Sequence, residues 1–108
     1  MSIAVLMATY NGETYLEAQI ESLLKQTYRD FIVYAHDDGS KDKTMQVLEK
    51  YVEQYPDKFR LLRYAALKSA KKNFFSLLKK VEADYYMFCD QDDIWLPEKI
   101  ENSFRLLK

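Results

Sequence analysis

Short apolar runs alternate with longer amphipathic stretches along all 108 residues of this chain. The first run, residues 3–8 (IAVLMA), is apolar throughout, which is typical of a parallel strand buried on both faces. Further strands are expected at residues 31–35, 59–64 and 85–89, and arginines within the third place it nearer a sheet edge. After each run, apolar residues recur at intervals of three and four, which predicts a helix.

The resulting βαβαβαβα pattern predicts an α/β fold. Strands joined by helices form a mostly parallel sheet with helices on both faces, a Rossmann-like three-layer sandwich. Right-handed crossovers make 3-2-1-4 the simplest doubly wound strand order. We expect one domain over residues 1–108, with ligands bound outside the carboxyl ends of the strands, near the switch point between strands 1 and 4.

The charge balance excludes some function classes. A net charge of −1 does not favour nucleic acid as a partner. Lysines cluster at residues 68–80, which we interpret as a solvated helix face; the alternative is a weak attraction for phosphates or a membrane surface. Cys89 is the single cysteine, which fits a cytoplasmic protein, and residues 3–8 are too short for a membrane span.

Acidic residues gather at the predicted carboxyl ends of two strands. Residues 37–38 (DD) follow the second strand and residues 90–93 (DQDD) follow the fourth, while residues 9–11 (TYN) follow the first. Five carboxylates on one rim repel one another unless hydrogen-bond donors or a cation compensate them. Mg²⁺ and Mn²⁺ prefer such oxygen ligands, so Asp90 and Asp92 are candidate metal ligands.

Structural interpretations stand beside these functional ones. Residues 90–93 could be an acidic turn before the last helix, and residues 37–40 a tight turn with Ser40 or Asp42 as a helix cap. Tyr10 could stack on a base or cover the core edge. His36 and Cys89 are expected to be packed, and Trp95 to anchor the last helix. The chain has no Gly-x-Gly-x-x-Gly, P-loop, nucleophile elbow or zinc spacing.

Four segments together resemble the family 2 inverting glycosyltransferases of the GT-A fold. They are residues 8–12 (ATYNG), 22–28 (SLLKQTY), 37–44 (DDGSKDKT) and 90–95 (DQDDIW), in order and at family spacing. The resemblance implies transfer of a sugar from a nucleotide diphosphate sugar, UDP- or dTDP-linked, to a hydroxyl of a saccharide or lipid-linked acceptor. The last segment is similar to that of bacterial enzymes that build surface polysaccharides, including rhamnosyltransferases.

The resemblance also implies roles for individual residues. Asp38 would hydrogen-bond the base, with support from Asp37. Asp92 would hold Mn²⁺ or Mg²⁺ on the diphosphate, and Asp90 would contact ribose or a metal-bound water. The residues thus implied in nucleotide binding are Ala8, Thr9, Tyr10, Asp37, Asp38 and Asp90, and those implied in metal binding are Asp92 and Asp90.

The chain departs from the family pattern in two respects. Residues 65–67 (AAL) stand where many relatives have a glycine, while Asn73 matches a family asparagine. The family also needs a further acceptor-binding part that carries the catalytic base, so we expect a truncated chain without a catalytic residue. Such a chain would bind the donor but transfer little sugar, and it could self-associate through an exposed face. If complete, the protein would act in the cytoplasm, or at the inner face of the membrane.

Two other classes remain as hypotheses. A receiver-like signalling module is also a small doubly wound domain with an acidic metal site, but it needs acids after strand 1 and a phosphoacceptor on strand 3. The corresponding segments here are residues 9–11 (TYN) and 64–65 (YA). A non-catalytic nucleotide-binding domain would bind nucleotide without dependence on Asp92.

Overall fold

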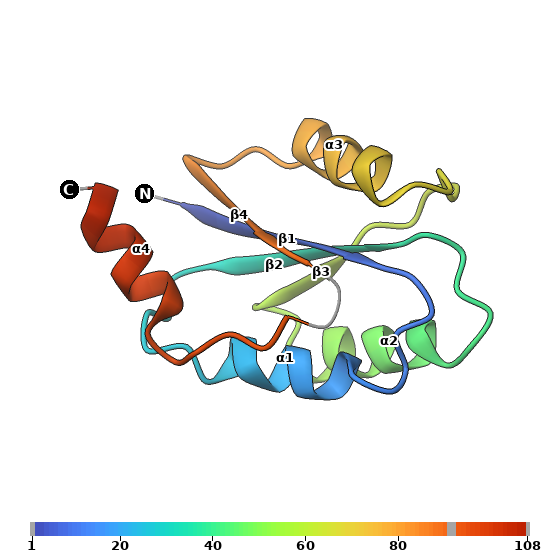
Figure 1. Ribbon diagram of the computed structural model, residues 1–108, viewed down its shortest axis with the longest axis horizontal. Helices are drawn as coiled ribbons and strands as arrows, with labels where there is room; N and C mark the ends of the chain where they lie inside the picture. Colours follow the sequence, from blue (N-terminus) through green and yellow to red (C-terminus); the bar gives the residue numbers. More distant parts are fainter. Residues whose placement is uncertain (1, 91–92, 108) are drawn as a thin grey trace.

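The computed structural model describes residues 2–90 and 93–107, with side chains described as far as residue 103. Within these residues the strands form one fully parallel sheet in the order β3-β2-β1-β4 (Figure 1). The predicted α/β class and strand order are confirmed. The elements are β1 (Ile3–Thr9), α1 (Leu16–Leu24), β2 (Ile32–Asp37), α2 (Thr44–Gln54), β3 (Phe59–Leu61), α3 (Ala70–Lys80), β4 (Tyr85–Cys89) and α4 (Lys99–Leu107).

Strand β1 is central and buried along its whole length, because helices cover both faces of the sheet. Helices α1 and α2 lie on one face and α3 on the other (Figure 1). Val5 and Met7 belong to the larger core under α1 and α2, whereas Ala4 and Leu6 belong to the smaller core under α3. Successive side chains of a strand alternate between faces, so both sets of β1 side chains are apolar until Thr9 at its carboxyl end.

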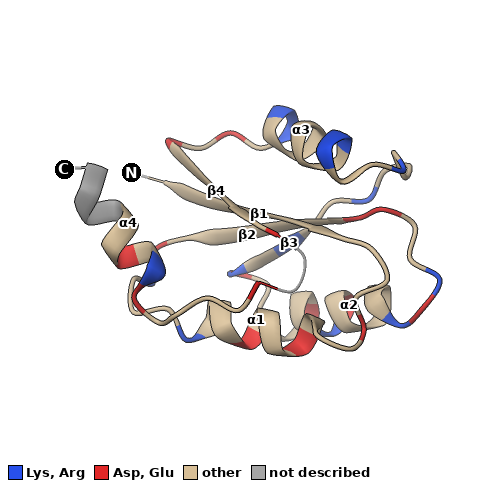
Figure 2. Ribbon diagram, viewed as in Figure 1, with Lys and Arg blue, Asp and Glu red and all other residues tan. Residues whose placement is uncertain are grey.

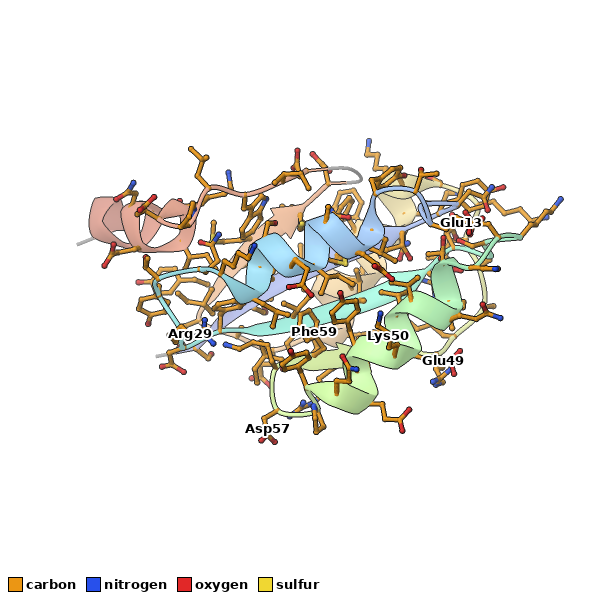
Figure 3. The ribbon with its side chains drawn as sticks, turned by 90° about the horizontal axis from the view of Figure 1, so that it is seen from below. Glu13, Arg29, Glu49, Lys50, Asp57 and Phe59 are labelled. Carbon is orange, nitrogen blue, oxygen red and sulfur yellow. The ribbon has the colours of Figure 1, made fainter. Side chains whose placement is uncertain are left out.

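The aromatic residues of α2 and β3 close the larger core at the sheet edge. Seen from the side of the sheet that α1 and α2 cover, Phe59 lies next to α2 (Figure 3). Its ring centroid is 6.4 Å from that of Tyr51 and 6.3 Å from that of Tyr55. This packing explains why β3, a short edge strand, begins at Phe59.

The ends of β1 and β2 differ from the prediction by one or two residues, and the end of β3 differs by three. Strand β3 ends at Leu61 rather than residue 64, because Tyr64 leaves the strand direction and stacks on the His36 ring at a centroid distance of 3.6 Å. Helix α4 begins at Lys99, and the Pro97 carbonyl just before it accepts a hydrogen bond from Thr27 N (2.8 Å).

The packing predicted for two residues near the acidic segment is confirmed. Cys89 is buried, and burial raises the pKa of its thiol to about 12. Trp95 is buried, and its backbone N–H donates to Ser22 Oγ (3.1 Å), which ties the segment before α4 to α1. In the part of the chain that the structure describes, every helix is too short or too polar to cross a membrane.

Candidate functional site

A cavity of about 550 Å³ opens at the carboxyl ends of β1 and β2, beside the amino end of α3. The predicted residues Ala8, Thr9, Tyr10 and Asp38 all line it. Its volume lies in the range of small-molecule sites. The cavity also uses the loop between β3 and α3, which the sequence analysis did not assign to the site. Other lining residues are Gly39, Lys41, Ala66, Lys68, Ser69, Ala70 and Asn73.

Asp38 joins the end of β2 to the loop before α3. Its side chain is buried, and Oδ1 accepts hydrogen bonds from Leu67 N (2.6 Å) and Lys68 N (2.9 Å). Its own N–H donates to Thr9 O (2.9 Å). Because both loop contacts use one carboxylate oxygen, a ligand donor in the cavity can bind the other. Asp38 therefore holds the cavity wall in place and offers an acceptor within it.

Asp37 has a different position from its neighbour. Its Oδ1 accepts from Thr9 Oγ1 (2.8 Å) and Ser40 Oγ (2.6 Å), and its Oδ2 accepts from Ser40 N (2.8 Å) and Gly39 N (3.2 Å). The four donors bind both carboxylate oxygens, and Asp37 is not among the cavity-lining residues. Asp37 thus organises the turn that carries Asp38, and hydrogen-bond donors rather than a metal compensate its charge.

Hydrogen bonds join the loops after β1 and β2 into one unit. Asn11, in the left-handed region at φ 47°, accepts from Lys41 N (2.9 Å) through Oδ1, and its N–H donates to Ser40 Oγ (2.8 Å). The next N–H, that of Gly12, donates to Thr44 Oγ1 (2.7 Å). This unit holds Tyr10 at the cavity mouth, where its side chain is 45% exposed rather than covering the core.

Replacing Thr44 by valine is expected to loosen this unit. The Thr44 hydroxyl donates to Asp42 and is the main reason that the pKa of Asp42 lies below its usual 3.8. Thr44→Val should therefore raise the pKa of Asp42 towards its usual value. Because a carboxylate with a lowered pKa stabilises the fold at neutral pH and loses that contribution as pH falls through its folded-state pKa, the stability of the variant should depend less on pH in the acid range. It also leaves the buried Gly12 N–H without an acceptor, at a cost of about 1–3 kcal/mol.

The measurements are an NMR titration of the Asp42 carboxyl and urea unfolding at neutral pH. Thr14→Val is the matched control, because Thr14 is an exposed residue in the neighbouring loop. An Asp42 pKa and a stability that both match the parent protein would contradict the assigned role of Thr44.

His36 and Asn73 form a buried link between β2 and α3. His36 Nδ1 lies 2.7 Å from Asn73 Oδ1, and His36 Nε2 lies 2.9 Å from Tyr64 O. Asn73 Nδ2 donates back to His36 O (3.1 Å). His36 is packed, as predicted, and through Asn73 it fixes the helix face that lines the cavity. The matched family asparagine was the sequence signal for Asn73.

Two lysines, Lys41 and Lys68, also line the cavity. Both place a cation beside a pocket that Asp38 also lines, and lysine is a common partner of phosphate oxygens. Lys68 has a left-handed backbone at φ 57°, which is uncommon for a lysine. Lys68 belongs to the lysine cluster for which attraction to phosphates stood as the alternative, whereas nothing in the sequence singled out Lys41.

Asp90 lies apart from the cavity. It follows β4 directly, is exposed, and lines a separate groove of about 340 Å³ between α3 and β4. Strands β2 and β4 both flank β1, so Asp38 and Asp90 end the two strands on either side of it. Asp92 lies outside the described residues, and among those that are described no group of three His, Cys, Asp or Glu could hold a metal. The Asp90 carboxylate has the oxygen chemistry that hard divalent cations prefer.

Known proteins resemble this chain in sequence and in fold. The model of the family described as Glycosyl transferase family 2 matches residues 4–108. The dTDP-rhamnosyl transferase RfbG of Shigella flexneri is 39% identical over 105 residues, which cover 94% of this chain and 36% of RfbG. TarS of S. aureus, solved in complex with UDP-GlcNAc, is 29% identical with a TM-score of 0.79, over 99% of this chain and 31% of that one.

A third likeness is structural alone. The mannosyltransferase PcManGT of Pyrobaculum calidifontis, in complex with GDP-Man and Mn²⁺, has a TM-score of 0.88 over 97% of this chain and 32% of its own, at 20% identity. That identity shows the shared GT-A fold and no more. The chain thus spans about a third of the length of these relatives. Because the family model covers nearly the whole chain, the receiver-like alternative is excluded, and the chain belongs to glycosyl transferase family 2.

Proposed function

We propose that this chain is the donor-binding part of an inverting glycosyltransferase. Its substrates would be a UDP- or dTDP-linked sugar and a hydroxyl of a saccharide or lipid-linked acceptor, in the synthesis of a bacterial surface polysaccharide. The observation that carries the proposal is the cavity in which Asp38 is fixed by two loop N–H groups beside Tyr10. The relatives named for dTDP-rhamnosyl transfer and solved with UDP-GlcNAc support it.

The cavity residues suit a pyrimidine nucleoside diphosphate. Uracil and thymine both carry an N3–H donor, which the second oxygen of Asp38 would accept. The exposed ring of Tyr10 would stack on the base, and Ala8 and Thr9 would line the ribose side. Lys41 and Lys68 would attract the diphosphate. Asp37 would act indirectly, through the turn that holds Asp38.

We propose that Asp92 and Asp90 hold Mn²⁺ or Mg²⁺ at the end of β4. A divalent cation there would offset the negative charge that develops on the departing diphosphate. We assign no catalytic base to these residues, and we expect the 108-residue chain to bind the donor without transferring sugar. We propose that the protein acts in the cytoplasm, or peripherally at the inner face of the membrane.

The test is calorimetric titration of UDP, dTDP and GDP into the chain, with Mn²⁺ or with a chelator. Mn²⁺ should strengthen the binding of UDP or dTDP by roughly tenfold or more, about 1.4 kcal/mol, because a cation on the diphosphate would offset its negative charge. Asp92→Ala should remove this gain. Asp57→Ala is the matched control, since Asp57 is exposed and lies before β3, at the opposite end of the sheet from the cavity (Figure 3).

Three outcomes have distinct meanings. The proposal is supported if Mn²⁺ strengthens nucleotide binding in the parent protein and in Asp57→Ala but not in Asp92→Ala. Nucleotide binding that is equal in all three proteins and independent of Mn²⁺ supports a non-catalytic nucleotide-binding domain instead. A folded protein that binds none of the three nucleotides contradicts the assignment of the cavity.

A further inference from the structure

Positive charge is concentrated in one continuous segment of the chain. Residues 58–81 contain eight of the 16 Lys and Arg residues and none of the 17 Asp and Glu residues. The segment therefore carries a formal charge of +8, and the remaining residues carry −9, for the total of −1. A protein that is almost neutral overall is thus strongly polarised along its sequence.

In the fold, five of these eight cations lie on α3 or in the loop before it, whereas the other three lie in or beside β3, where Arg63 pairs with Glu49 of α2 (3.5 Å). Helix α3 is the helix that covers one face of the sheet, and it carries lysines but no acidic residue (Figure 2). Helices α1 and α2, on the opposite face, both carry acidic residues (Figure 2). The acidic residues of α1 and α2 are Glu17, Glu21, Glu49 and Glu53.

An aromatic side chain stands at the centre of the basic face. Phe75 is 53% exposed, although Asn73 and Leu77 of the same helix are fully buried. Lys71 and Lys79 are four residues before and after Phe75, and Lys72 is three residues before it. Residues at these spacings lie next to one another on a helix surface. We call Lys71, Lys72, Phe75 and Lys79 the α3 patch.

We propose that the α3 patch binds the surface of an anionic lipid bilayer. The lysines would contact lipid phosphates, and Phe75 would enter the boundary between headgroups and acyl chains. A soluble phosphate compound would explain the lysines but would give no partner to the exposed phenyl ring. A bilayer offers both negative charge and hydrocarbon, so it would provide a partner for both parts of the α3 patch.

This docking would also orient the candidate site. The cavity is lined by residues at the amino end of α3, so it would lie close to the bilayer surface. A lipid-linked acceptor would then be presented near the bound donor. That consequence rests on the proposed function, whereas the bilayer contact itself does not depend on it.

The test is co-sedimentation of the chain with phosphatidylcholine vesicles that contain phosphatidylglycerol, against phosphatidylcholine alone. We expect binding to the anionic vesicles alone, reduced by salt. The triple variant Lys71→Gln, Lys72→Gln, Lys79→Gln should lower the partition coefficient by roughly a hundredfold, because each lysine near an anionic surface adds about 1 kcal/mol. Phe75→Ser should lower it by roughly tenfold.

Matched variants separate this surface from general charge and apolarity. The triple variant Lys25→Gln, Lys43→Gln, Lys50→Gln removes the same charge from exposed positions on the α1 and α2 side. Leu96→Ser removes an apolar side chain that is 76% exposed elsewhere. Both controls should bind anionic vesicles like the parent protein, and circular dichroism should show that all variants are folded.

Three results would overturn the inference: no binding to the anionic vesicles, an equal loss in a control variant, or preferential binding of RNA over vesicles. Nucleotide titration without vesicles is a separate measurement. A chain that binds nucleotide but not vesicles would refute the bilayer contact and leave the donor site standing. A chain that binds vesicles but not nucleotide would refute the donor site and leave the bilayer contact standing.

Discussion

Asp38→Asn is expected to weaken UDP or dTDP binding by roughly tenfold to a hundredfold while the protein stays folded. An asparagine still offers one oxygen to Leu67 N and Lys68 N, so the loop before α3 keeps its anchor. The other oxygen becomes an amide N–H that meets the N3–H of the base, and a charged hydrogen bond of about 1.5–3 kcal/mol is lost. Isothermal titration calorimetry with thermal unfolding measures both effects.

Two further variants make this prediction sharper. Asp38→Ala removes the loop anchor as well, so it should lose both affinity and stability. Asp57→Asn removes the same charge at an exposed position before β3 that does not line the cavity, and should bind nucleotide normally. Full affinity in Asp38→Asn would show that the base does not contact this carboxylate.

Asp37→Ala is expected to destabilise the fold by roughly 2–4 kcal/mol. It removes the acceptor of four hydrogen bonds, from Thr9, Gly39 and twice from Ser40. A hydrogen bond to a charged group contributes about 1.5–3 kcal/mol, and contributions within one network do not add fully. For a domain of this size the midpoint of thermal unfolding should fall by about 10–20 °C. Urea unfolding and scanning calorimetry provide the measurements.

Asp37→Asn distinguishes a structural role from direct ligand contact. Asparagine keeps one acceptor oxygen for Thr9 and Ser40, so it should lose less stability than alanine does. If Asp37 acts only through the turn, the folded variant should bind nucleotide with nearly parental affinity. A large loss of affinity at full stability would instead place Asp37 in contact with the nucleotide.

The sequence determined the architecture, because the architecture depends on local patterns. The unbroken apolar run of β1 requires burial on both faces, and four strand–helix alternations with right-handed crossovers lead to the observed order. The same reasoning placed Ala8, Thr9, Tyr10 and Asp38 at one edge of the sheet, where the cavity lies. The roles of Asp90 and Asp92 in metal binding stay predictions.

The tertiary structure alone decided how the site is built from that edge. The family resemblance assigned different roles to Asp37 and Asp38, but only the structure shows that Asp37 binds turn donors while Asp38 binds N–H groups 29 and 30 positions away. Lys41 and Lys68 line the cavity, and His36 is held by Asn73, 37 positions later. Such contacts arise only when the crossover through α3 brings distant segments together. Local periodicity fixes which face of an element is buried, but it carries no information about which distant polar group that face will meet.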